Sequence, residues 1–592
     1  MKTNNILILS VLLMLTKLGG CADFGDNFLE KPPSVDVTKD TIFSKLEYAE
    51  QFLWGAYKTL PYGMPTNWGD GLYMGGDIIE SITDLNQSDL TWSGSQTTYY
   101  TGAYQPDFEN GAYWAQGTKY NFVKRRDAWR GIRSSYIFIA NIGNVPNIDQ
   151  QTKNKLIAEA KMIIAVHYTD MFRHYGGVPW INHAYAVDED LNIERSTSLA
   201  TADSIVALID EAIPDLPWII QDTNNWDGRF TKAAAMGLKA RVLLFSASPL
   251  FNSDQPFLEG SASEKKLTWH GKYDQSLWGK AADAAHELIE KVESEGGYAL
   301  VKTGNPRKDF QDAYYKRGNG ELLITTRITY KPNGFFDPNY LMYQLIAWYG
   351  VGGPTYNYVK MFPMANGEPI TSPTSGYDPN NPLINRDPRL YETVLVDGDY
   401  YMGRTAQMWV GGVDRPTENA TQAATGFGWR KFGLERTPET SGSAVTEWPY
   451  LRLAEIYLSY AEAANEVNNG PTAEAYRCVN IVRNRVGLGD LPTGLSKEEF
   501  REIILNERAC EFGYEEVRWY DIIRWKREDI FKKDIKGLNI YRDPNTGQKT
   551  YVEFNKPTRY WQNNFSPKWY LSAFATNELD KGYGLIQNPG WE

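Results

Sequence analysis

The chain has 592 residues, and its 73 Asp and Glu outnumber its 61 Lys and Arg, which gives a formal net charge of -12. This acidic balance opposes nucleic-acid binding, which depends on basic patches, and adhesion to anionic lipid surfaces. With only three cysteines, the fold is not a disulfide scaffold. The length allows a large core, and the aromatic content of 14% suits both a core and a half-exposed binding face.

Residues 1–20 are predicted to be a lipoprotein signal peptide. A positively charged start precedes an apolar run, 6–15, that is too short to span a bilayer as a helix. The sequence LGGC at 18–21 resembles the bacterial lipobox, in which the cysteine is acylated and becomes the new N-terminus. Lys17 departs from the usual pattern, and an ordinary signal peptide before a cysteine is the alternative. We expect Cys21 to hold the protein in the outer-membrane lipid through its acyl chains.

Residues 21–40 are predicted to be a linker between Cys21 and the folded part. The segment contains acidic residues and two consecutive prolines, which form helices and strands poorly, so we expect an extended chain. The globular part should start near Thr41 and form a single domain over 41–592.

Helical periodicity predicts a mainly α-helical scaffold. Apolar residues recur on one face of 41–60, and the pattern returns in four later segments. These segments are 127–145, 152–179, 198–217 and 228–251. The helix in 152–179 should end at Gly176-Gly177, because Pro179 follows shortly. Alanines at 233, 234, 235 and 240 should let another helix approach closely.

The clearest predicted unit is a helical hairpin in 449–488. Its first helix should run to about Val467. Gly470 suits a helix end, and Pro471 suits the first turn of the next helix. The hairpin is similar to a tetratricopeptide unit, although the chain has no exact internal repeat.

A last long helix should begin at the capping box of Ser496 and Glu499 and continue to about residue 525. It carries a run of acids and bases: Glu507, Arg508, Glu511, Glu515, Arg518, Asp521 and Arg524. The run could suggest a catalytic carboxylate pair, but its i,i+3 and i,i+4 spacing favours structural ion pairs along the helix. Cys478 and Cys510 fall in helical patterns and are expected to be buried thiols rather than a disulfide.

Residues 61–123 and 297–447 lack this regularity and are rich in Gly, Pro, Asn and Tyr. A short strand-like run occurs at 321–330. Long irregular stretches inside a domain are usually functional loops or disorder, and the many aromatic residues argue against disorder. We expect a helical scaffold that carries ordered, aromatic-rich loops and a few short strands.

A set of sequence segments follows in a characteristic order along the chain. They are FLEKPP after Cys21, a helix ending in GGVP at 176–179, GRFTKAAAMGLKARVLL, NRDPRL at 385–390, PYLRLAEIYLSYAEAANE, ERACEFGYEEVRWYDIIRW and QNPGW at 587–591. Together they resemble the SusD/RagB family of surface lipoproteins from Bacteroidetes-type bacteria, over nearly all of the mature chain. The resemblance implies a tetratricopeptide-like helical scaffold with a less regular ligand face. It also implies a non-catalytic nutrient-binding role, usually for a glycan, and a SusC-like TonB-dependent transporter as partner.

Two clusters of aromatic residues fall in the irregular regions, where the resemblance places the ligand face. A flat indole or phenol can stack on the apolar face of a sugar ring, while polar side chains bond the sugar hydroxyls. Trp92 and Trp348 are preferred, because Ser- and Gly-rich sequence surrounds them, although any one ring could instead belong to the core. The full set of candidates is Trp68, Trp92, Tyr99, Trp114, Tyr340, Trp348 and Tyr349.

His167, His174 and His183 lie close in sequence, but we do not expect them to bind a metal. On a continuous helix the first two are separated by roughly 10 Å along the axis. Two nitrogens that share one zinc each lie only about 2 Å from it. Motifs of known catalytic and cofactor sites are absent, so neither a cofactor nor enzymatic activity is expected. A glycosidase, however, needs only two carboxylates.

The sequence therefore predicts a lipid-anchored glycan-binding protein that faces the cell exterior from the outer membrane. It would deliver its ligand to a SusC-like TonB-dependent transporter. A peptide-binding subunit of the RagB type is the first alternative, and a polysaccharide hydrolase is the second. The aromatic loops favour a glycan, because a peptide binder should depend more on grooves that bond the peptide backbone.

Overall fold

The computed structural model describes residues 38–63, 74, 77–91, 94–109, 128–186, 188–328, 350–433 and 446–592. The predicted signal peptide 1–20, Cys21 and most of the predicted linker 21–40 lie outside the described residues. The first described helix, α2 (Lys39–Ile42), begins just before Thr41. None of the described helices has the length and apolar composition needed to cross a lipid bilayer.

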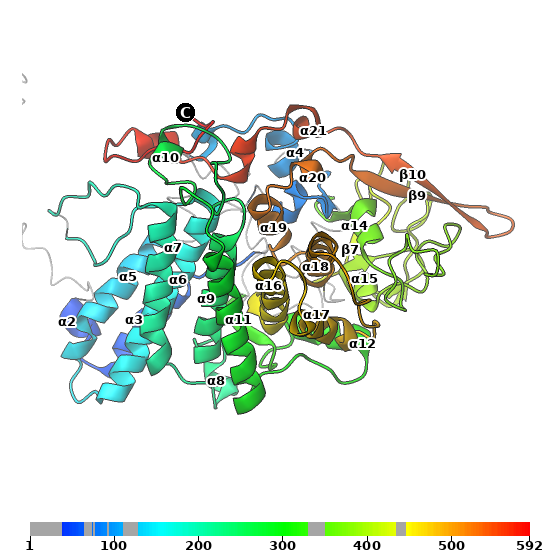
Figure 1. The fold of residues 1–592 in the computed structure, drawn as a ribbon. Helices are drawn as coiled ribbons and strands as arrows, with labels where there is room; N and C mark the ends of the chain where they lie inside the picture. Colours follow the sequence, from blue (N-terminus) through cyan, green and yellow to red (C-terminus); the bar gives the residue numbers. More distant parts are fainter. Residues whose placement is uncertain are drawn as a thin grey trace, which may run out of the picture.

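Helices dominate the fold, as predicted. Six of them form a line in which each helix packs on the next along the chain (Figure 1). They are α3 (Leu46–Tyr57), α5 (Ala128–Asn141), α6 (Gln150–Tyr175), α7 (Ser198–Ala212), α9 (Lys232–Ala247) and α11 (Ser276–Glu295). We call this line the helical scaffold.

Two local features of the scaffold, the end of α6 and the alanines of α9, confirm predictions from the sequence. Helix α6 ends at Tyr175, and Gly176 caps it with a φ of 78°, a backbone conformation that favours glycine. In α9, Ala233, Ala235 and Ala240 are fully buried, and the helix packs against both α7 and α11. The small side chains on α9 thus allow the neighbouring helices to approach it closely, as the alanines in the sequence predict.

A second group of helices continues from α11, which packs on α16. The group comprises α16 (Leu453–Val467), α17 (Ala473–Arg485), α18 (Lys497–Phe512) and α19 (Arg518–Arg524). The predicted hairpin is α16 and α17, and Ala461, Ala464 and Ala475 are buried in it. Thr472 caps α17, so Pro471 precedes the helix instead of lying in its first turn. The capping box of Ser496 and Glu499 opens α18 as predicted.

The prediction of one continuous last helix is wrong, because the chain breaks between α18 and α19. Tyr514 and Glu516 have φ angles of 66° and 60°, which a right-handed helix does not allow. At Gly513, a Cβ atom would lie 1.9 Å from the hydroxyl oxygen of Tyr358. Close packing against Tyr358 therefore requires glycine at the point where α18 ends.

The charged run is structural, but its partners differ from the predicted ones. Glu511 of α18 accepts from Arg452 at 3.0 Å and Arg389 at 3.1 Å, and it also pairs with Arg485. All four side chains are fully buried. Buried charges require close partners, and these come from other elements rather than from the next turn of the same helix. Asp521 and Arg524 of α19 are an exception, paired at i,i+3.

The strands are short and form two-stranded antiparallel pairs. The pairs are β1 (Asn86–Gln87) with β3 (Gly353–Pro354), β2 (Leu322–Ile328) with β8 (Thr446–Arg452), β4 (Val394–Leu395) with β7 (Gly428–Trp429), β5 (Tyr400–Tyr401) with β6 (Arg404–Thr405), and β9 (Lys536–Arg542) with β10 (Lys549–Asn555). Strand β2 lies within the strand-like run predicted at 321–330. The β9–β10 hairpin projects from the body at the right of Figure 1.

Short helices connect these parts. They are α4 (Gly94–Thr98), α8 (Thr223–Trp226), α10 (Ser261–Glu264), α12 (Pro306–Tyr315), α14 (Tyr356–Met361), α15 (Pro388–Thr393), α20 (Glu528–Phe531), α21 (Tyr560–Asn564) and α22 (Thr576–Leu579). A large apolar core extends from Phe43 to Trp591. Cys478 and Cys510 are free and buried, as predicted, and burial raises the pKa of both thiols.

Candidate functional site

Two segments that are far apart in the sequence meet at what we call the junction, residues 84–89 and 350–355. Here β1 pairs with β3, and the Asp89 N–H donates to the Gly350 carbonyl at 2.8 Å. The first segment belongs to the first predicted aromatic-rich region, and the second belongs to the other. The two predicted loop regions are therefore hydrogen-bonded to each other in the folded chain.

Arg559 holds the first segment of the junction from below the surface. Its guanidinium donates to the carbonyls of Thr83 and Asn86, both at 2.7 Å, and to Gln87 Oε1 at 2.9 Å. It also stacks over the ring of Tyr100 at 4.4 Å. Burial lowers the pKa of Arg559. One side chain thus satisfies several buried loop oxygens, which would otherwise lack donors.

Two ion pairs tie the same segment to the C-terminal part of the chain. Arg518 Nη2 lies 2.9 Å from Asp84 Oδ2, and Lys556 Nζ lies 2.9 Å from Asp89 Oδ1. Burial opposes ionisation of Asp84, but the charge and hydrogen bonds of Arg518 outweigh it and lower the pKa of that carboxyl. The junction is consequently fixed by residues from the C-terminal part of the chain, far away in the sequence.

The break between α18 and α19 also contacts the junction. The Tyr514 hydroxyl donates to Asn86 Oδ1 at 3.1 Å, and the Glu516 N–H donates to Glu80 Oε1 at 2.7 Å. Glu80 is buried, and burial together with the nearby Glu516 carboxylate raises its pKa to about 8. Glu80 therefore holds its proton at neutral pH.

Tyr99 is the candidate aromatic that the structure describes, and it lies in the core. Its side chain has no exposed surface, stacks on Tyr104 at 5.2 Å, and packs beside Trp561 and Trp569. A ring that is enclosed in this way cannot stack on a sugar, so we assign Tyr99 to packing. The candidates that lie outside the described residues are Trp68, Trp92, Trp114, Tyr340, Trp348 and Tyr349.

The three neighbouring histidines have separate surroundings. His167 Nε2 lies 2.8 Å from Thr59 Oγ1, and His174 Nε2 lies 2.7 Å from the Tyr520 hydroxyl. His183 is exposed and contacts Glu189. Within the ranges that the structure describes, His, Cys, Asp and Glu side chains do not gather in threes as a metal site would require.

Sequence reasoning missed the polar residues that hold the junction. Arg559 stands in a short irregular stretch, KPTRYW, where periodicity gives no signal. The sequence places Arg518 in a run of ion pairs along one helix, yet its partner Asp84 lies 434 positions away. Only the fold reveals such pairs, because no local pattern links residues at that separation.

Solved structures of SusD-like proteins share this fold. A SusD-like protein from Bacteroides fragilis is 22% identical and matches with a TM-score of 0.72 over 95% of this chain and 100% of that chain. A SusD-like carbohydrate binding protein from the same organism, 22% identical, matches at 0.66 over 91% and 99%. A laminarin binding SusD-like protein, 18% identical, matches at 0.56 over 93% and 100%.

Residues 329–591 match the model of the SusD family, and this match supports the assignment of the chain to the SusD/RagB family. SusD-like protein P25 of Formosa agariphila is 23% identical over 555 residues, which cover 89% of this chain and 91% of P25. SusD-like protein P2 of the same organism is 41% identical over 88 residues, which cover 14% of this chain and 17% of P2.

Proposed function

We propose that the protein is a non-catalytic, cell-surface glycan-binding lipoprotein that passes its ligand to a SusC-like TonB-dependent transporter. The match of residues 329–591 to the SusD family supports this function. So do two proteins of similar fold, one described as carbohydrate binding and the other as laminarin binding. The two clusters of aromatic residues supply side chains of the type that stacks on sugars.

The observation that carries the proposal is the junction. Trp92 follows Asp89 by three residues, and Trp348 precedes Gly350 by two residues. The Asp89–Gly350 hydrogen bond joins the two segments next to which these tryptophans stand in the sequence. Two indoles drawn from distant parts of the sequence can then act on one ligand.

A glycan array with the purified mature protein identifies the ligand, and calorimetry with that ligand tests the aromatic residues. We expect Trp92→Ala and Trp348→Ala each to weaken binding about tenfold, and the double variant to weaken it about a hundredfold. Trp226→Ala is the matched control, because Trp226 is 38% exposed in α8 of the helical part. Equal affinities for all three single variants would show that the two tryptophans are not part of the binding site.

The first alternative, a peptide-binding subunit, is tested with the same variants. A peptide library replaces the glycan array, and the mature protein is screened at equal concentration. Binding of peptides that depends on Trp92 or Trp348, with no glycan bound, would replace the glycan proposal by this one.

The second alternative, a polysaccharide hydrolase, requires two accessible carboxylates. The acids of the α18 run do not meet this condition, because Glu507, Glu511 and Glu515 are buried in ion pairs. Incubating the protein with its glycan and measuring new reducing ends decides the question. Sustained release that depends on enzyme concentration would overturn the non-catalytic proposal.

The lipid anchor and the surface location belong to the same proposal. We expect protease added to intact cells to remove the protein, and Cys21→Ser to release it from the membrane fraction. Protection in intact cells, with digestion only after lysis, would contradict display on the outer surface.

The transporter is proposed as a partner because the resemblance to the SusD/RagB family implies a SusC-like TonB-dependent transporter. Two proteins on one membrane have a high effective concentration, so a modest interface suffices. Mild-detergent purification of a tagged protein should recover a TonB-dependent transporter in near-equal amount. Recovery of the lipoprotein alone, under conditions that preserve a known complex of this kind, would leave a free-standing surface binder.

A further inference from the structure

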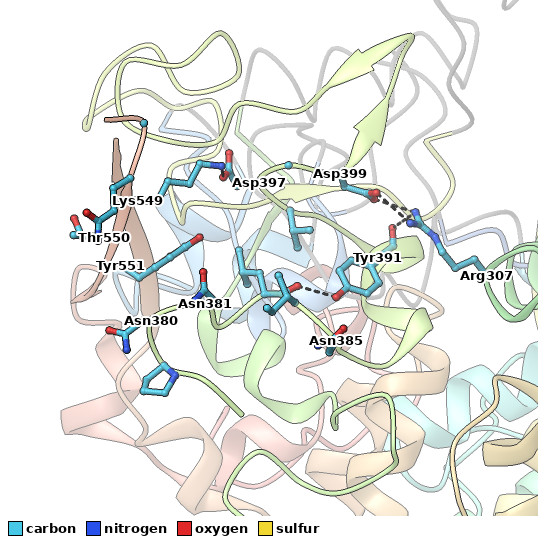
Figure 2. A pocket seen from close by; sticks show the side chains of 17 residues that line it. Arg307, Asn380, Asn381, Asn385, Tyr391, Asp397, Asp399, Lys549, Thr550 and Tyr551 are labelled. Carbon is cyan, nitrogen blue, oxygen red and sulfur yellow. Dashed lines mark hydrogen bonds and ion pairs between the residues drawn. The ribbon is translucent and has the colours of Figure 1, made fainter. Parts of the chain in front are cut away.

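A cavity of about 1050 Å³ lies between segment 379–399 and the end of the β9–β10 hairpin at 547–551 (Figure 2). Arg307 of α12 closes one end of it. We call this cavity the hairpin cleft. Its volume is at the upper end of the range that small-molecule sites usually have.

The hairpin cleft is separate from the junction. Lys556, which pairs with Asp89 of the junction, follows Tyr551 of the cleft by five residues. A strand rises about 3.3 Å per residue, so roughly 16 Å of chain separates the two positions. One hairpin therefore contacts the junction at its base and lines the cleft farther along.

The charged groups of the hairpin cleft neutralise one another. Lys549 pairs with Asp397, whose other carboxylate oxygen accepts the Met408 N–H at 2.9 Å. Arg307 Nη2 lies 3.0 Å from Asp399 Oδ2. Two cations and two anions in the lining thus leave no net charge, which disfavours a strongly charged ligand.

Neutral hydrogen-bonding groups and two aromatic rings, Tyr391 and Tyr551, make up the rest of the polar lining. Figure 2 shows the Tyr551 ring reaching from β10 toward Asn381. Asn380 and Asn385 also face the cavity, and Thr550 lines it beside Tyr551.

Tyr551 is available to a ligand. Its side chain is half-buried. It packs against the edge of the apolar core, but among the described residues no aromatic ring stacks on it and its hydroxyl makes no hydrogen bond. Amides, hydroxyls and an unstacked phenol ring match the hydroxyl rim and the apolar face of a sugar.

We propose that the hairpin cleft is a second binding site, separate from the junction, for a short neutral oligosaccharide. The class of ligand rests on the proposed function, whereas the location rests on the cavity and its lining. Tyr551 stacks on a sugar ring, and the asparagines bond its hydroxyl groups. A peptide fits less well, because its charged termini and side chains would meet no uncompensated charge in this lining.

The test uses the mature protein that carries Trp92→Ala and Trp348→Ala, so that only the cleft remains. Saturation-transfer NMR with maltotriose, cellotriose, laminaritriose and xylotriose measures binding at millimolar concentration. We expect at least one trisaccharide to bind. Adding Tyr551→Ala should weaken it about tenfold, and Tyr551→Phe should retain most of the affinity.

Val552→Ala is the matched control, because Val552 is next to Tyr551 on β10, points to the opposite face and is 49% exposed. Equal urea midpoints for Tyr551→Ala and Val552→Ala show that both variants fold. The proposal is overturned if Tyr551→Ala binds as Val552→Ala does, if none of the four trisaccharides binds, or if only a tripeptide such as trialanine binds.

The same variants separate this proposal from the proposed function. If only the tryptophan substitutions reduce glycan binding, the hairpin cleft is not a site and the proposed function stands. If Tyr551→Ala alone reduces it, the cleft is the glycan site and the role of the two tryptophans fails. If the unsubstituted protein binds no glycan on the array or in solution, both proposals fail.

Discussion

The helical scaffold and the irregular part of the molecule satisfy their buried backbone groups in different ways. In the scaffold, carbonyls are bonded within helices, and helices meet through small side chains such as Ala235. In the irregular part, buried arginines supply the donors. Arg386 donates to the carbonyls of Val359 and Phe362, and Arg559 does the same beside the junction.

This difference shows how loops without regular structure can be held in one arrangement. A guanidinium has five N–H donors in a fixed fork, so one arginine can bond several carbonyls from separate turns. A binding face can then be positioned accurately without a sheet or a helix beneath it. Single arginines consequently carry more of the stability in this part than single residues do in the scaffold.

The largest effect is expected where a buried arginine serves several acids. Arg452 pairs with Glu321, Glu511 and Glu515, and all of these groups are buried. Arg452→Ala leaves uncompensated charges and should lower the free energy of unfolding by about 3–5 kcal/mol. Urea unfolding followed by circular dichroism measures this.

Lys532→Ala is the control for that substitution, because Lys532 pairs with Glu528 on the surface of the molecule. Exposed pairs contribute only about 0–1 kcal/mol. Similar urea midpoints for the two variants would contradict the view that buried arginines hold the irregular part.

A smaller effect is expected at the junction. Arg559→Lys keeps the positive charge but cannot reach Thr83, Asn86 and Gln87 with one ammonium group. Because buried acceptors are left without donors, the substitution should lower the free energy of unfolding by about 2–3 kcal/mol and weaken glycan binding. Calorimetry and urea unfolding measure both effects. Arg542→Lys, on the exposed end of β9, is the control. If Arg559→Lys binds the glycan with unchanged affinity, the junction does not position the ligand face.

Much of the scaffold could be predicted from the sequence, because its signals are local. The end of α6 at Gly176 and the capping box of Ser496 and Glu499 depend on residues within one turn. The break after α18 could not be predicted. It depends on Tyr358, which packs against Gly513 from a segment far away in the sequence.

The candidate site was less predictable for the same reason. Aromatic residues in an irregular region serve either a core or a ligand face, and composition does not separate the two roles. Tyr99 belongs to the core because Trp561 and Trp569 pack beside it from the C-terminal part of the chain. The position of the first aromatic-rich region likewise depends on Arg559, which no sequence pattern marks.

A third prediction concerns pH and the buried Glu80 beside the junction. Its pKa is raised from 4.5 to about 8, so the folded protein keeps a proton that the unfolded chain releases. This contribution to stability is complete below pH 4.5 and is lost as the pH rises toward about 8. Glu80→Gln carries no such proton. As the pH rises from 4.5 to about 8, its free energy of unfolding should therefore increase relative to that of the unsubstituted protein, by at most about 1.4 kcal/mol per pH unit. Parallel curves of unfolding free energy against pH would show that Glu80 is ionised in the folded state.

The smallest effect is expected inside the scaffold, at Gly237 of α9. Replacing a glycine within a helix by alanine usually gains about 1 kcal/mol. Here the new Cβ would lie 2.9 Å from Leu323 Cδ1 and 3.0 Å from Leu451 Cδ2, so both side-chain ends must shift. The free energy of unfolding of Gly237→Ala should therefore lie within about 0.5 kcal/mol of that of the unsubstituted protein, because the gain in helix propensity and the crowding offset each other. Gly55→Ala in α3 is the matched control, since a Cβ there has open space and the full gain should appear. An equal gain at both positions would mean that α9 packs more loosely on β2 and β8 than the small-residue contact requires.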